Sequence, residues 1–299
     1  MGLTVGSRLV RVRDADGLAR VGVVVGDELS VLPTDDMLGA LLAGELPDAV
    51  AHVPLLDPET CAPAEPWRLL APIVAPETWA AGVTYERSRD ARLRESQVAD
   101  VYERVYHAER PELFLKDAAG RRTVGPGEPI GVRTDASWTV PEPELAVVLG
   151  AGSVPLAATI GNDVSSRDIE GANPLYLPQA KVYAGACALG PALLVPVDWR
   201  VPFDIELRIV GAEGDGLFAG RTSTANMRRS LTELIEFLRR DNPVPAGSVL
   251  MTGTGIVPPD DLTLAPGQTV EIRIPGIGTL RNPVSARARS HEREEEAHV

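Results

Sequence analysis

Lysine is nearly absent from this sequence of 299 residues. Only Lys116 and Lys181 are lysine among 29 basic residues, and the others are arginine. Such a bias usually reflects the base composition of a genome, but it draws attention to the two positions where lysine remains. A lysine ammonium is a compact charge that can lose its proton when buried, whereas an arginine guanidinium cannot. Both lysines are therefore candidates for functional positions.

Cysteine and long apolar runs are also scarce. Cys61 and Cys187 are too far apart in sequence to suggest a disulfide framework, and they lack the paired spacing of zinc-binding cysteines. We find no apolar run long enough to cross a bilayer and no N-terminal signal with a basic and then an apolar region. These absences predict a cytoplasmic protein with two free thiols and no membrane association.

Positive charge is in deficit, because the formal net charge is −13 at pH 7. A surface that binds nucleic acid or an anionic membrane needs a basic field to attract its partner and release counterions. The charge balance therefore argues against both kinds of partner. It favours a small-molecule substrate or a metal ion.

The pattern of the chain predicts a small first domain, residues 1–70, and a larger second one, residues 71–285. The first holds short alternating runs and a helix-like MLGALLAG, which predicts an α+β unit. Between Pro54 and Pro76 the chain is rich in proline and shows no clear periodicity, so we interpret it as a surface connection. The charged tail, residues 286–299, has almost no apolar side chains and is expected to be disordered.

Strand-like segments dominate the larger domain. They are ELFLK, PIGVRT, ELAVVLG, AATIGND, FDIELRIVG, GSVLMTG and QTVEIRIPG. Among the later segments only NMRRSLTELIEFLRRD has the pattern of a long amphipathic helix, although a charged helical stretch also runs through VADVYERVYHAER. Strands outnumber helices and do not alternate with them, which predicts a β-rich α+β fold and argues against a doubly wound nucleotide-binding fold.

Two acidic residues, Glu142 and Glu144, lie at the entrance of the apolar strand in SWTVPEPELAVVLG, residues 137–150. Alternate side chains of a strand point to the same face, so the two carboxylates share a side. Like charges placed together are unfavourable unless a cation or a proton lies between them. A hard divalent cation, which prefers oxygen ligands, would satisfy the pair.

A third ligand is available in Asp163, which follows the strand-like AATIGN and precedes a helical turn. The four histidines lie in the first domain, in a charged helix and in the tail, so none is a convincing ligand. A set of oxygen ligands without histidine or cysteine favours Mg²⁺ or Mn²⁺ over zinc. A plainer alternative places Glu142 and Glu144 at an exposed strand end and makes Asp163 a helix N-cap. The pattern alone leaves both interpretations open.

Three further features are candidates for chemistry. Lys181 precedes a run of small residues, and its plainer interpretation is a lysine that extends along an apolar surface. Lys116 follows Glu112 by four residues on one strand face, where a weak salt bridge is the alternative. The turn in MTGTGIVP, residues 251–258, can present backbone N–H groups to a carboxylate, although it lacks the spacing of a phosphate-binding loop.

Taken in this order, these stretches resemble the fumarylacetoacetate hydrolase family. The family pattern combines two glutamates one residue apart, an ND-x-S/T-S/A-RD segment, a downstream lysine and a late TGTG turn. The chain matches it over about residues 77–285, with residues 142 and 144, 162–168, 181 and 252–255. The resemblance implies a mixed β-sandwich roll after a small N-terminal α+β domain, in a homodimer or higher homo-oligomer. It also implies a Mg²⁺ or Mn²⁺ site held by Glu142, Glu144 and Asp163.

Within that family the sequence is most similar to the 2-keto-3-deoxy-D-arabinonate dehydratases. The similar stretches are PETWAAGVTYERSRDAR, VYHAERPELFLK, WTVPEPELAVVLG and DIEGANPLYLPQAKVYAGACALGP. Hydrolase members usually carry a histidine with a nearby glutamate in the lid segment to activate water. The corresponding TYERSRDARLRES contains no histidine, and Ser88 stands at about its position. The resemblance therefore favours dehydration over hydrolysis.

The activity implied is metal-dependent dehydration of a 2-keto-3-deoxy sugar acid, 2-keto-3-deoxy-D-arabinonate to 2,5-dioxopentanoate, in the oxidative degradation of pentoses. The metal would act as a Lewis acid while Glu112 and Lys181 serve as base and acid, with the order left open. The residues expected to hold the substrate are Tyr85, Glu86, Ser88, Lys116, Thr252, Gly253 and Thr254. Two alternatives remain: a metal-dependent hydrolase or decarboxylase that cleaves a C–C bond of a dioxo acid, and a non-catalytic metal-binding protein.

Overall fold

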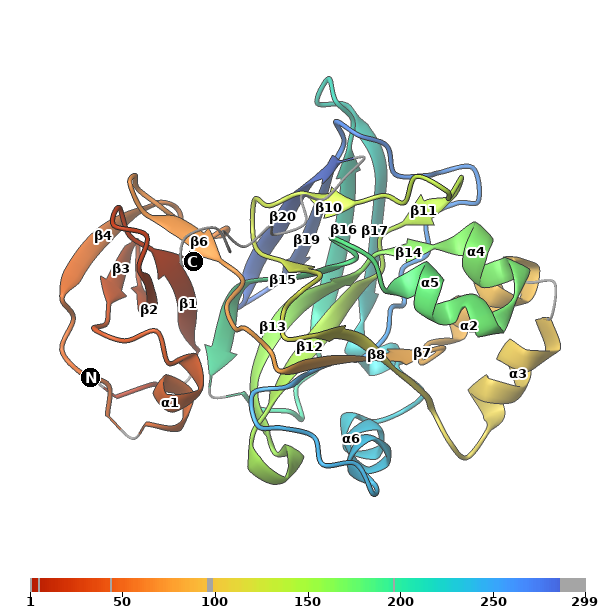
Figure 1. Ribbon diagram of the computed structural model, residues 1–299, viewed down its shortest axis with the longest axis horizontal. Coiled ribbons are helices and arrows are strands. Elements are labelled where there is room, and N and C mark those ends of the chain that lie inside the picture. The colour runs from red at the N-terminus through yellow and green to blue at the C-terminus, as the bar shows by residue number, and fades with distance from the viewer. Residues whose placement is uncertain (1, 5, 44, 96–98, 196, 286–299) are drawn as a thin grey trace, which may run out of the picture.

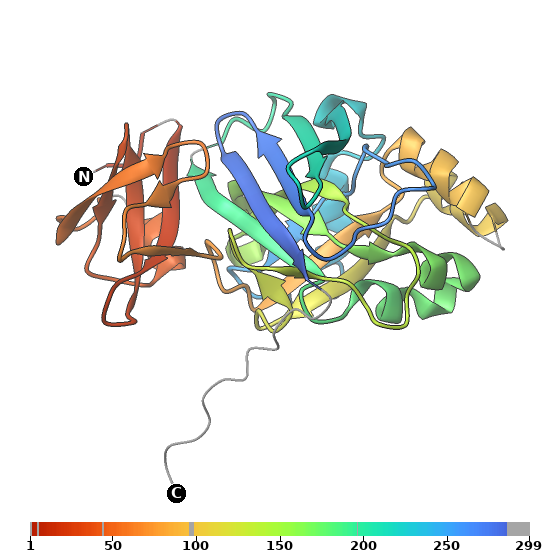
Figure 2. The same cartoon turned by 90° about the horizontal axis from the view of Figure 1, so that it is seen from above.

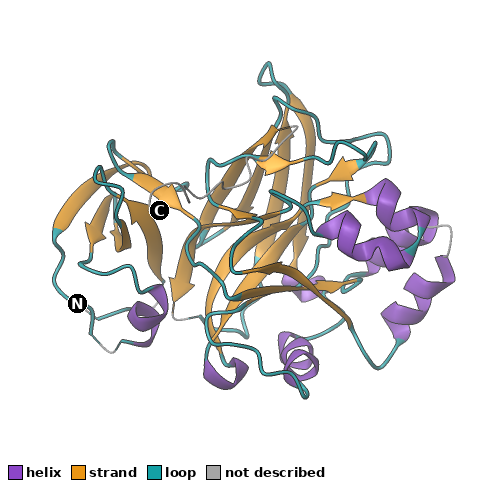
Figure 3. Ribbon diagram, viewed as in Figure 1, coloured by secondary structure: helices purple, strands orange, loops and turns teal. Residues whose placement is uncertain are grey.

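The computed structural model describes residues 2–4, 6–43, 45–95, 99–195 and 197–285. Its described part consists mainly of β-strands, which form one large sheet, a second sheet and a short two-stranded ladder (Figures 1 and 3). The predicted β-rich α+β fold is confirmed. The predicted tail, residues 286–299, lies outside the described residues.

The large sheet has the strand order β5-β4-β3-β2-β1-β15-β13-β12-β18-β7-β8, with β6 beside β1 and β9 beside β15. Its strands are β1 (Ser7–Arg13), β2 (Ala19–Val25), β3 (Glu28–Val31), β4 (Ala51–Asp57), β5 (Ala62–Pro63), β6 (Arg68–Leu70), β7 (Glu77–Gly82), β8 (Glu112–Ala118), β9 (Thr123–Val124), β12 (Pro143–Leu149), β13 (Pro155–Asp163), β15 (Cys187–Val195) and β18 (Val249–Met251).

The second sheet runs in the order β10-β20-β19-β16-β17. Its strands are β10 (Ile130–Gly131), β16 (Asp204–Val210), β17 (Gly216–Ser223), β19 (Thr269–Ile274) and β20 (Gly278–Ser285). The two-stranded ladder pairs β11 (Thr139–Val140) with β14 (Ser165–Ser166).

The central strand β12 is buried on both faces, which explains its continuous apolar sequence. Its odd-numbered apolar residues belong to the core that includes the second sheet, with Leu207 and Ile272 among its members. Ala146 and Val148 belong to a separate core that reaches Leu9 and the helix α1. Because side chains alternate along a strand, β12 contributes side chains to both cores. Glu142 and Glu144, which are even-numbered, point to the same face as Ala146.

The first strand joins the N-terminal unit to the rest of the large sheet, because β1 pairs antiparallel with β15 from Ser7↔Val195 to Leu9↔Leu193. The proline-rich stretch that we interpreted as a surface connection instead contains most of β4 and all of β5 and β6, so that prediction is wrong. Proline is tolerated near a sheet edge, where its missing N–H costs no ladder hydrogen bond, and β5 is the edge strand here. The boundary near residue 70 stays a prediction.

The helices are short and gather mainly at one end of the molecule, away from the N-terminal unit (Figures 1 and 2). They are α1 (Met37–Leu42), α2 (Glu86–Glu95), α3 (Ala99–His107), α4 (Arg167–Ala172), α5 (Leu177–Lys181) and α6 (Leu231–Arg239), with 3₁₀ turns η1 (Ala151–Ser153), η2 (Pro174–Tyr176) and η3 (Thr224–Asn226). The predicted amphipathic helix is α6, which Ser230 caps through a hydrogen bond from the N–H of Glu233. In the part of the chain that the structure describes, no helix is long and apolar enough to span a membrane.

Candidate active site

The structure brings the three predicted carboxylates together at the ends of two paired strands. Glu142 immediately precedes β12, Glu144 lies within it, and Asp163 ends the neighbouring β13. One oxygen from each carboxylate lies within 4.8 Å of the others. Their side chains are buried, with exposures of 5%, 1% and 1%. The alternative of exposed carboxylates at a strand end is therefore wrong, and Ser166 rather than Asp163 is the N-cap residue of α4.

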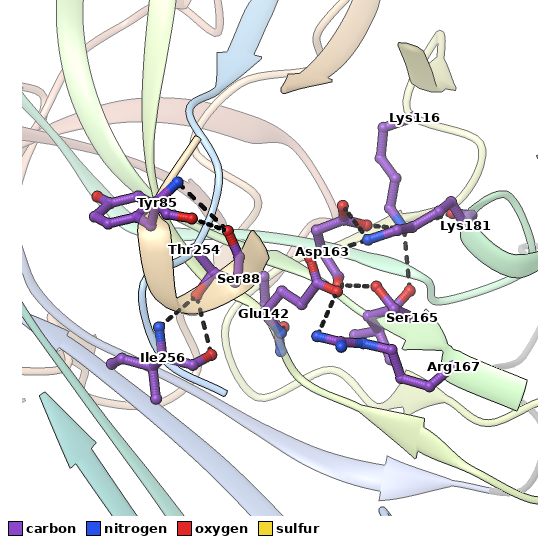
Figure 4. Close-up of polar contacts among 12 residues, drawn as sticks. Tyr85, Ser88, Lys116, Glu142, Asp163, Ser165, Arg167, Lys181, Thr254 and Ile256 are labelled. Atoms are coloured by element: carbon purple, nitrogen blue, oxygen red, sulfur yellow. Dashed lines mark hydrogen bonds and ion pairs between the residues drawn. The ribbon is translucent and has the colours of Figure 1, made fainter. Parts of the chain in front are cut away.

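Three buried cationic side chains contact two of these carboxylates (Figure 4). The ammonium of Lys181 donates to Glu142 Oε2 at 2.9 Å and to Asp163 Oδ2 at 3.0 Å. Arg167 Nη2 lies 3.1 Å from Glu142 Oε1. Lys116 Nζ forms an ion pair with Asp163 Oδ1 and donates to the backbone carbonyl of Val164 at 3.1 Å and to that of Lys181.

Both lysines thus lie in the interior, which excludes the interpretation of Lys181 as a surface side chain. The ion pair of Lys116 is with Asp163 in the interior, not a weak one at an exposed strand end. Lys181 ends α5 with 3% of its surface exposed, and Lys116 on β8 is fully buried. Lys116 pairs with Asp163, so its role is to hold this carboxylate and the Lys181 backbone in place. Its predicted contact with a substrate remains untested.

Glu144 has a different environment from the other two carboxylates. Its Oε2 accepts a hydrogen bond from the N–H of Gly253 at 2.6 Å. Among the described residues no cationic side chain forms a salt bridge with it. Burial, together with the charges of Asp163 and Glu142, raises the pKa of Glu144 well above its usual value. The ionised form therefore requires further positive charge at this point.

A divalent cation fits this arrangement. The three ligands offer only carboxylate oxygen, the donor that Mg²⁺ and Mn²⁺ prefer over sulfur or imidazole. A cation among them would supply the charge that Glu144 lacks. The geometry and the chemistry of the donors therefore agree with the metal site predicted from the sequence.

The TGTG turn follows β18 and presents backbone to the site. Gly253 has φ +91°, and a Cβ there would lie 2.0 Å from Thr84 Oγ1 and 2.9 Å from the carbonyl oxygen of Ala81. Only glycine fits this close approach in the left-handed region. The hydroxyl of Thr252 donates to the carbonyl of Leu145 at 2.9 Å, so this side chain attaches the turn to β12. The Thr254 hydroxyl accepts from the N–H of Ile256 at 3.2 Å.

A small cavity adjoins the carboxylates, and it offers about 20 Å³ to the centre of a water molecule. That space holds about one water and is too small for a five-carbon acid. The cavity is lined by both polar and apolar residues, which are Ala81, Gly82, Val83, Ser88, Glu112, Phe114, Glu142, Asp163, Glu170, Lys181 and Thr254. Glu112, at the start of β8, and Lys181 thus line the same cavity, and their catalytic roles stay a prediction.

The predicted lid residues fall into different environments. We define the lid as the helices α2 and α3. Ser88 lines the cavity, and its hydroxyl donates to the carbonyl of Tyr85 at 2.8 Å. Tyr85 is 2% exposed and packs against Gly255, and burial raises the pKa of its phenol. The Glu86 side chain is 73% exposed and pairs with Arg89 at 3.3 Å. Tyr85 and Glu86 do not line the described cavity, so their contact with a substrate stays a prediction.

Sequence reasoning missed two residues of the site, Arg167 and Glu170. Arg167 stands in the NDVSSRD motif, from which we selected only Asp163. Glu170 is 3% exposed and lines the cavity from α4. The signal available was their spacing, because residues three apart share a helix face. It went unused because α4 is too short to show periodicity.

Comparisons with known proteins agree with this geometry. Residues 78–285 match the family model described as "Fumarylacetoacetate (FAA) hydrolase C-terminal". A probable 2-keto-3-deoxyxylonate dehydratase of Haloferax volcanii is 49% identical over 215 residues, 72% of this chain and 74% of that protein. The 2-dehydro-3-deoxy-D-arabinonate dehydratase of Saccharolobus solfataricus is 49% identical over 227 residues, 74% of this chain and 75% of that protein.

A solved structure also matches closely. It is a 2-keto-3-deoxy-D-arabinonate dehydratase complexed with magnesium and 2,5-dioxopentanoate, with a TM-score of 0.81 and 38% identity. The match covers 94% of this chain and 100% of that one. The likeness therefore extends over the N-terminal unit as well as over the sheets that carry the site.

We predict opposite effects of Glu144→Gln on stability and on metal binding. Because the fold raises the pKa of Glu144, the free energy of unfolding of the metal-free protein falls as pH rises from about 4.5 through the raised pKa. Glutamine removes that charge, so the metal-free variant at pH 8 should be more stable than wild type. Its affinity for Mg²⁺ should fall at least about tenfold.

Urea denaturation in EDTA at pH 6 and pH 8 checks the stability, and calorimetric titration with Mg²⁺ checks the affinity. Glu213→Gln, at an exposed position in the turn between β16 and β17, is the control and should change neither quantity. A metal-free Glu144→Gln protein less stable than wild type at pH 8 would contradict the electrostatic account.

We predict that Gly253→Ala destabilises the protein more than Gly214→Ala does. Gly214 has φ +87° with nothing within 4 Å of a Cβ, so alanine there costs only the left-handed backbone, about 1–2 kcal/mol. Alanine at Gly253 has the same backbone cost, and its Cβ would also collide with Thr84. The turn must then shift, which moves the N–H of residue 253 away from Glu144. Urea denaturation and Mg²⁺ titration of both variants test this, and equal losses of stability would refute it.

Proposed function

This chain belongs to the fumarylacetoacetate hydrolase family, and from that premise we propose that it dehydrates a 2-keto-3-deoxy sugar acid with Mg²⁺ as cofactor. The substrate is 2-keto-3-deoxy-D-arabinonate and the product 2,5-dioxopentanoate. One observation carries most of the argument. Three buried carboxylates that suit a hard cation lie beside a cavity that also holds Glu112 and Lys181, in a chain 49% identical to two dehydratases of such acids.

The reaction removes water in two proton transfers. A base takes a proton from C3, the C4–OH bond breaks, and an acid gives the departing hydroxyl a proton, so that water leaves. Tautomerisation of the resulting enone then converts the terminal CH₂OH to an aldehyde, which completes 2,5-dioxopentanoate. A bound Mg²⁺ supplies Lewis acidity that draws electrons from the 2-oxo group and makes the C3 proton easier to remove.

We assign the base to Glu112 and the acid to Lys181. The carboxyl group of Glu112 belongs to the cavity wall, and an ionised carboxylate can accept the C3 proton. The Lys181 side chain lines the same cavity and donates hydrogen bonds to Glu142 and Asp163, so its N–H groups reach the site. An ammonium group at this place can give a proton to the departing hydroxyl.

The lid supports dehydration rather than hydrolysis of a C–C bond. Hydrolase members of the family use a lid histidine to activate water, and among the described residues no histidine lines the cavity. Ser88, the polar residue that the lid contributes to the cavity, has a hydroxyl bonded to the Tyr85 backbone. The hydroxyls of Ser88 and Thr254 can accept hydrogen bonds from substrate hydroxyls, or donate to substrate oxygens once they release the backbone carbonyls that they now contact. Closure of α2 above them would exclude bulk water.

We also propose a homodimer or a higher homo-oligomer that works in the cytoplasm. Support for the assembly comes from the family resemblance. Sedimentation of the purified protein tests it, and a monomer at micromolar concentration would exclude it. The cytoplasmic location stays a prediction from the sequence.

We predict that the protein with Mg²⁺ converts a 2-keto-3-deoxypentonate to an aldehyde with loss of one water. A panel of 2-keto-3-deoxy pentonates and hexonates should be incubated with and without EDTA, while substrate loss and aldehyde appearance are followed by NMR. The amount of aldehyde formed should equal the amount of substrate lost, and EDTA should stop the reaction. Pyruvate or another cleavage product from every active substrate would exclude the dehydratase. If no acid of the panel reacts, the hydrolase or the non-catalytic alternative is favoured.

We predict that Glu112→Gln and Lys181→Met separate the two proton transfers. In deuterated water, Glu112→Gln should lose both C3 exchange and dehydration by about 10²–10⁴-fold, because the base is absent. Lys181→Met should lose dehydration by a similar factor but retain exchange at C3. Mg²⁺ titration of each variant shows whether the metal site survives, and the exposed Glu109→Gln is the matched control. Exchange that is lost in Lys181→Met and kept in Glu112→Gln would reverse the assignment.

A further inference from the structure

The described cavity accommodates about one water, so a five-carbon acid fits only if part of the cavity wall moves. The lid contributes Ser88 to that wall. The lid begins after Thr84 and Tyr85, and α3 ends shortly before Glu112. The residues at these two ends therefore determine where the lid walls return after each opening. Both ends contact the same short segment, residues 227–229, which we call the anchor.

The anchor contacts the beginning of the lid through its backbone. Met227 forms an isolated antiparallel bridge with Tyr85. The N–H of the next residue, Arg228, donates to the carbonyl of Thr84 at 2.9 Å. Thr84 is fully buried and also donates its hydroxyl to Thr252, so the anchor, the lid and the TGTG turn meet at this point.

The anchor contacts the far end of the lid through the guanidinium of Arg229. Its nitrogens donate to three carbonyls at the end of α3, those of Val105 at 3.2 Å, Ala108 at 2.6 Å and Glu109 at 3.2 Å. The last carbonyls of a helix lack intrahelical partners, and a planar fork of five N–H groups can satisfy several at once. Glu233 on α6 supplies the counter-charge at 2.5 Å. Arg229 is 4% exposed, so these bonds are shielded from water.

A tyrosine on α3 links the two lid helices to the anchor. The guanidinium of Arg89, on α2, lies 4.8 Å from the ring centroid of Tyr106. The guanidinium of Arg228 lies 4.9 Å from the same centroid. Cations at this distance are attracted by the ring face. The stack thus couples α2, α3 and the anchor at a side chain that is 9% exposed.

The anchor is itself attached to the rigid part of the fold. Ser230, the next residue, caps α6, and the helix buries Leu234, Ile235 and Leu238 in the main core. Glu112 follows Glu109 by three residues, with the buried Pro111 between them, and it pairs with Gly82 across β7 and β8. A fixed end of α3 therefore restricts the position of the Glu112 carboxylate.

We propose that the anchor, residues 227–229, fixes both ends of the lid and that Arg229 is a positioning residue for Glu112. The three bonds of its guanidinium return α3 and the start of β8 to one place after each opening. The assignment to catalysis rests on the proposed function, since it takes Glu112 as the base. The attachment of the lid does not depend on that role.

The test compares Arg229→Lys with wild type by hydrogen exchange and by kinetics. Lysine keeps the charge, but its compact ammonium cannot span three carbonyls. Amides of residues 84–95 and 99–110 should exchange about tenfold faster or more in the variant, because bonds to a charged donor limit local opening. Amides of residues 143–163 should be unchanged. With Mg²⁺ saturating, kcat should fall about tenfold or more while the Kd for Mg²⁺ stays within about twofold, because the metal ligands lie on other strands.

Two further variants keep the result decisive. Glu233→Gln leaves the guanidinium in place and removes its counter-charge, so it should show the same pattern more weakly, and it serves if Arg229→Lys does not fold. Arg240→Met, at an exposed arginine at the end of α6, is the control and should match wild type. Unchanged amide exchange in residues 84–95 and 99–110, or equally faster exchange throughout the sheet, would show that the anchor does not hold the lid. A lower kcat explained by weaker metal binding would overturn the positioning role.

The outcomes also separate this inference from the proposed function. If wild type converts no keto-deoxy acid while Arg229→Lys still accelerates amide exchange only in residues 84–95 and 99–110, the proposed function is wrong and the role of the anchor is supported. If wild type is active and the variant matches it in both exchange and kcat, the role of the anchor is wrong and the proposed function is supported.

Discussion

Burial of three like charges at one point is the constraint on which this structure depends. Ionised carboxylates in an interior are costly unless opposite charge accompanies them. Lys116, Lys181 and Arg167 supply it to Asp163 and Glu142 by direct ion pairs, whereas among the described residues Glu144 has no salt bridge and accepts a backbone N–H. The fold therefore holds an arrangement that a divalent cation completes. In the proposed reaction a cation held by Glu142, Glu144 and Asp163 would neutralise their charge and would also withdraw electrons from a bound keto acid.

The sheet architecture explains how such different segments reach the site. β12 and β13 pair antiparallel, so the start of β12 lies beside the end of β13. This pairing brings Glu142 next to Asp163. The turn after β18 lies beside β12 and offers Gly253 to Glu144. The helices at that end add Lys181 and Arg167. The large sheet therefore positions the ligands, and short helices and turns provide the groups that neutralise them.

The sequence was informative where a local period carried the information. Glu142 and Glu144 were predictable as a pair because side chains alternate along a strand, and Lys181 attracted attention because lysine is rare. The burial of Lys116 against Asp163 was not predictable, since it depends on the relative placement of strands that are not neighbours in the sheet. α4 and α5 are too short for a helical period, and prolines concealed β4 to β6. Arg229 had no local signal, because its partners are carbonyls more than a hundred residues away.

The pairing of β1 with β15 has a consequence for how the molecule can be divided. β15 carries β13 on one side, and on the other it is covered by β1 and β9. Removal of the first seventy residues would uncover a row of unpaired N–H and C=O groups flanked by apolar side chains. Such an open margin recruits strands from other copies and leads to aggregation. The N-terminal unit thus protects one side of β15 by supplying the strand that pairs with it.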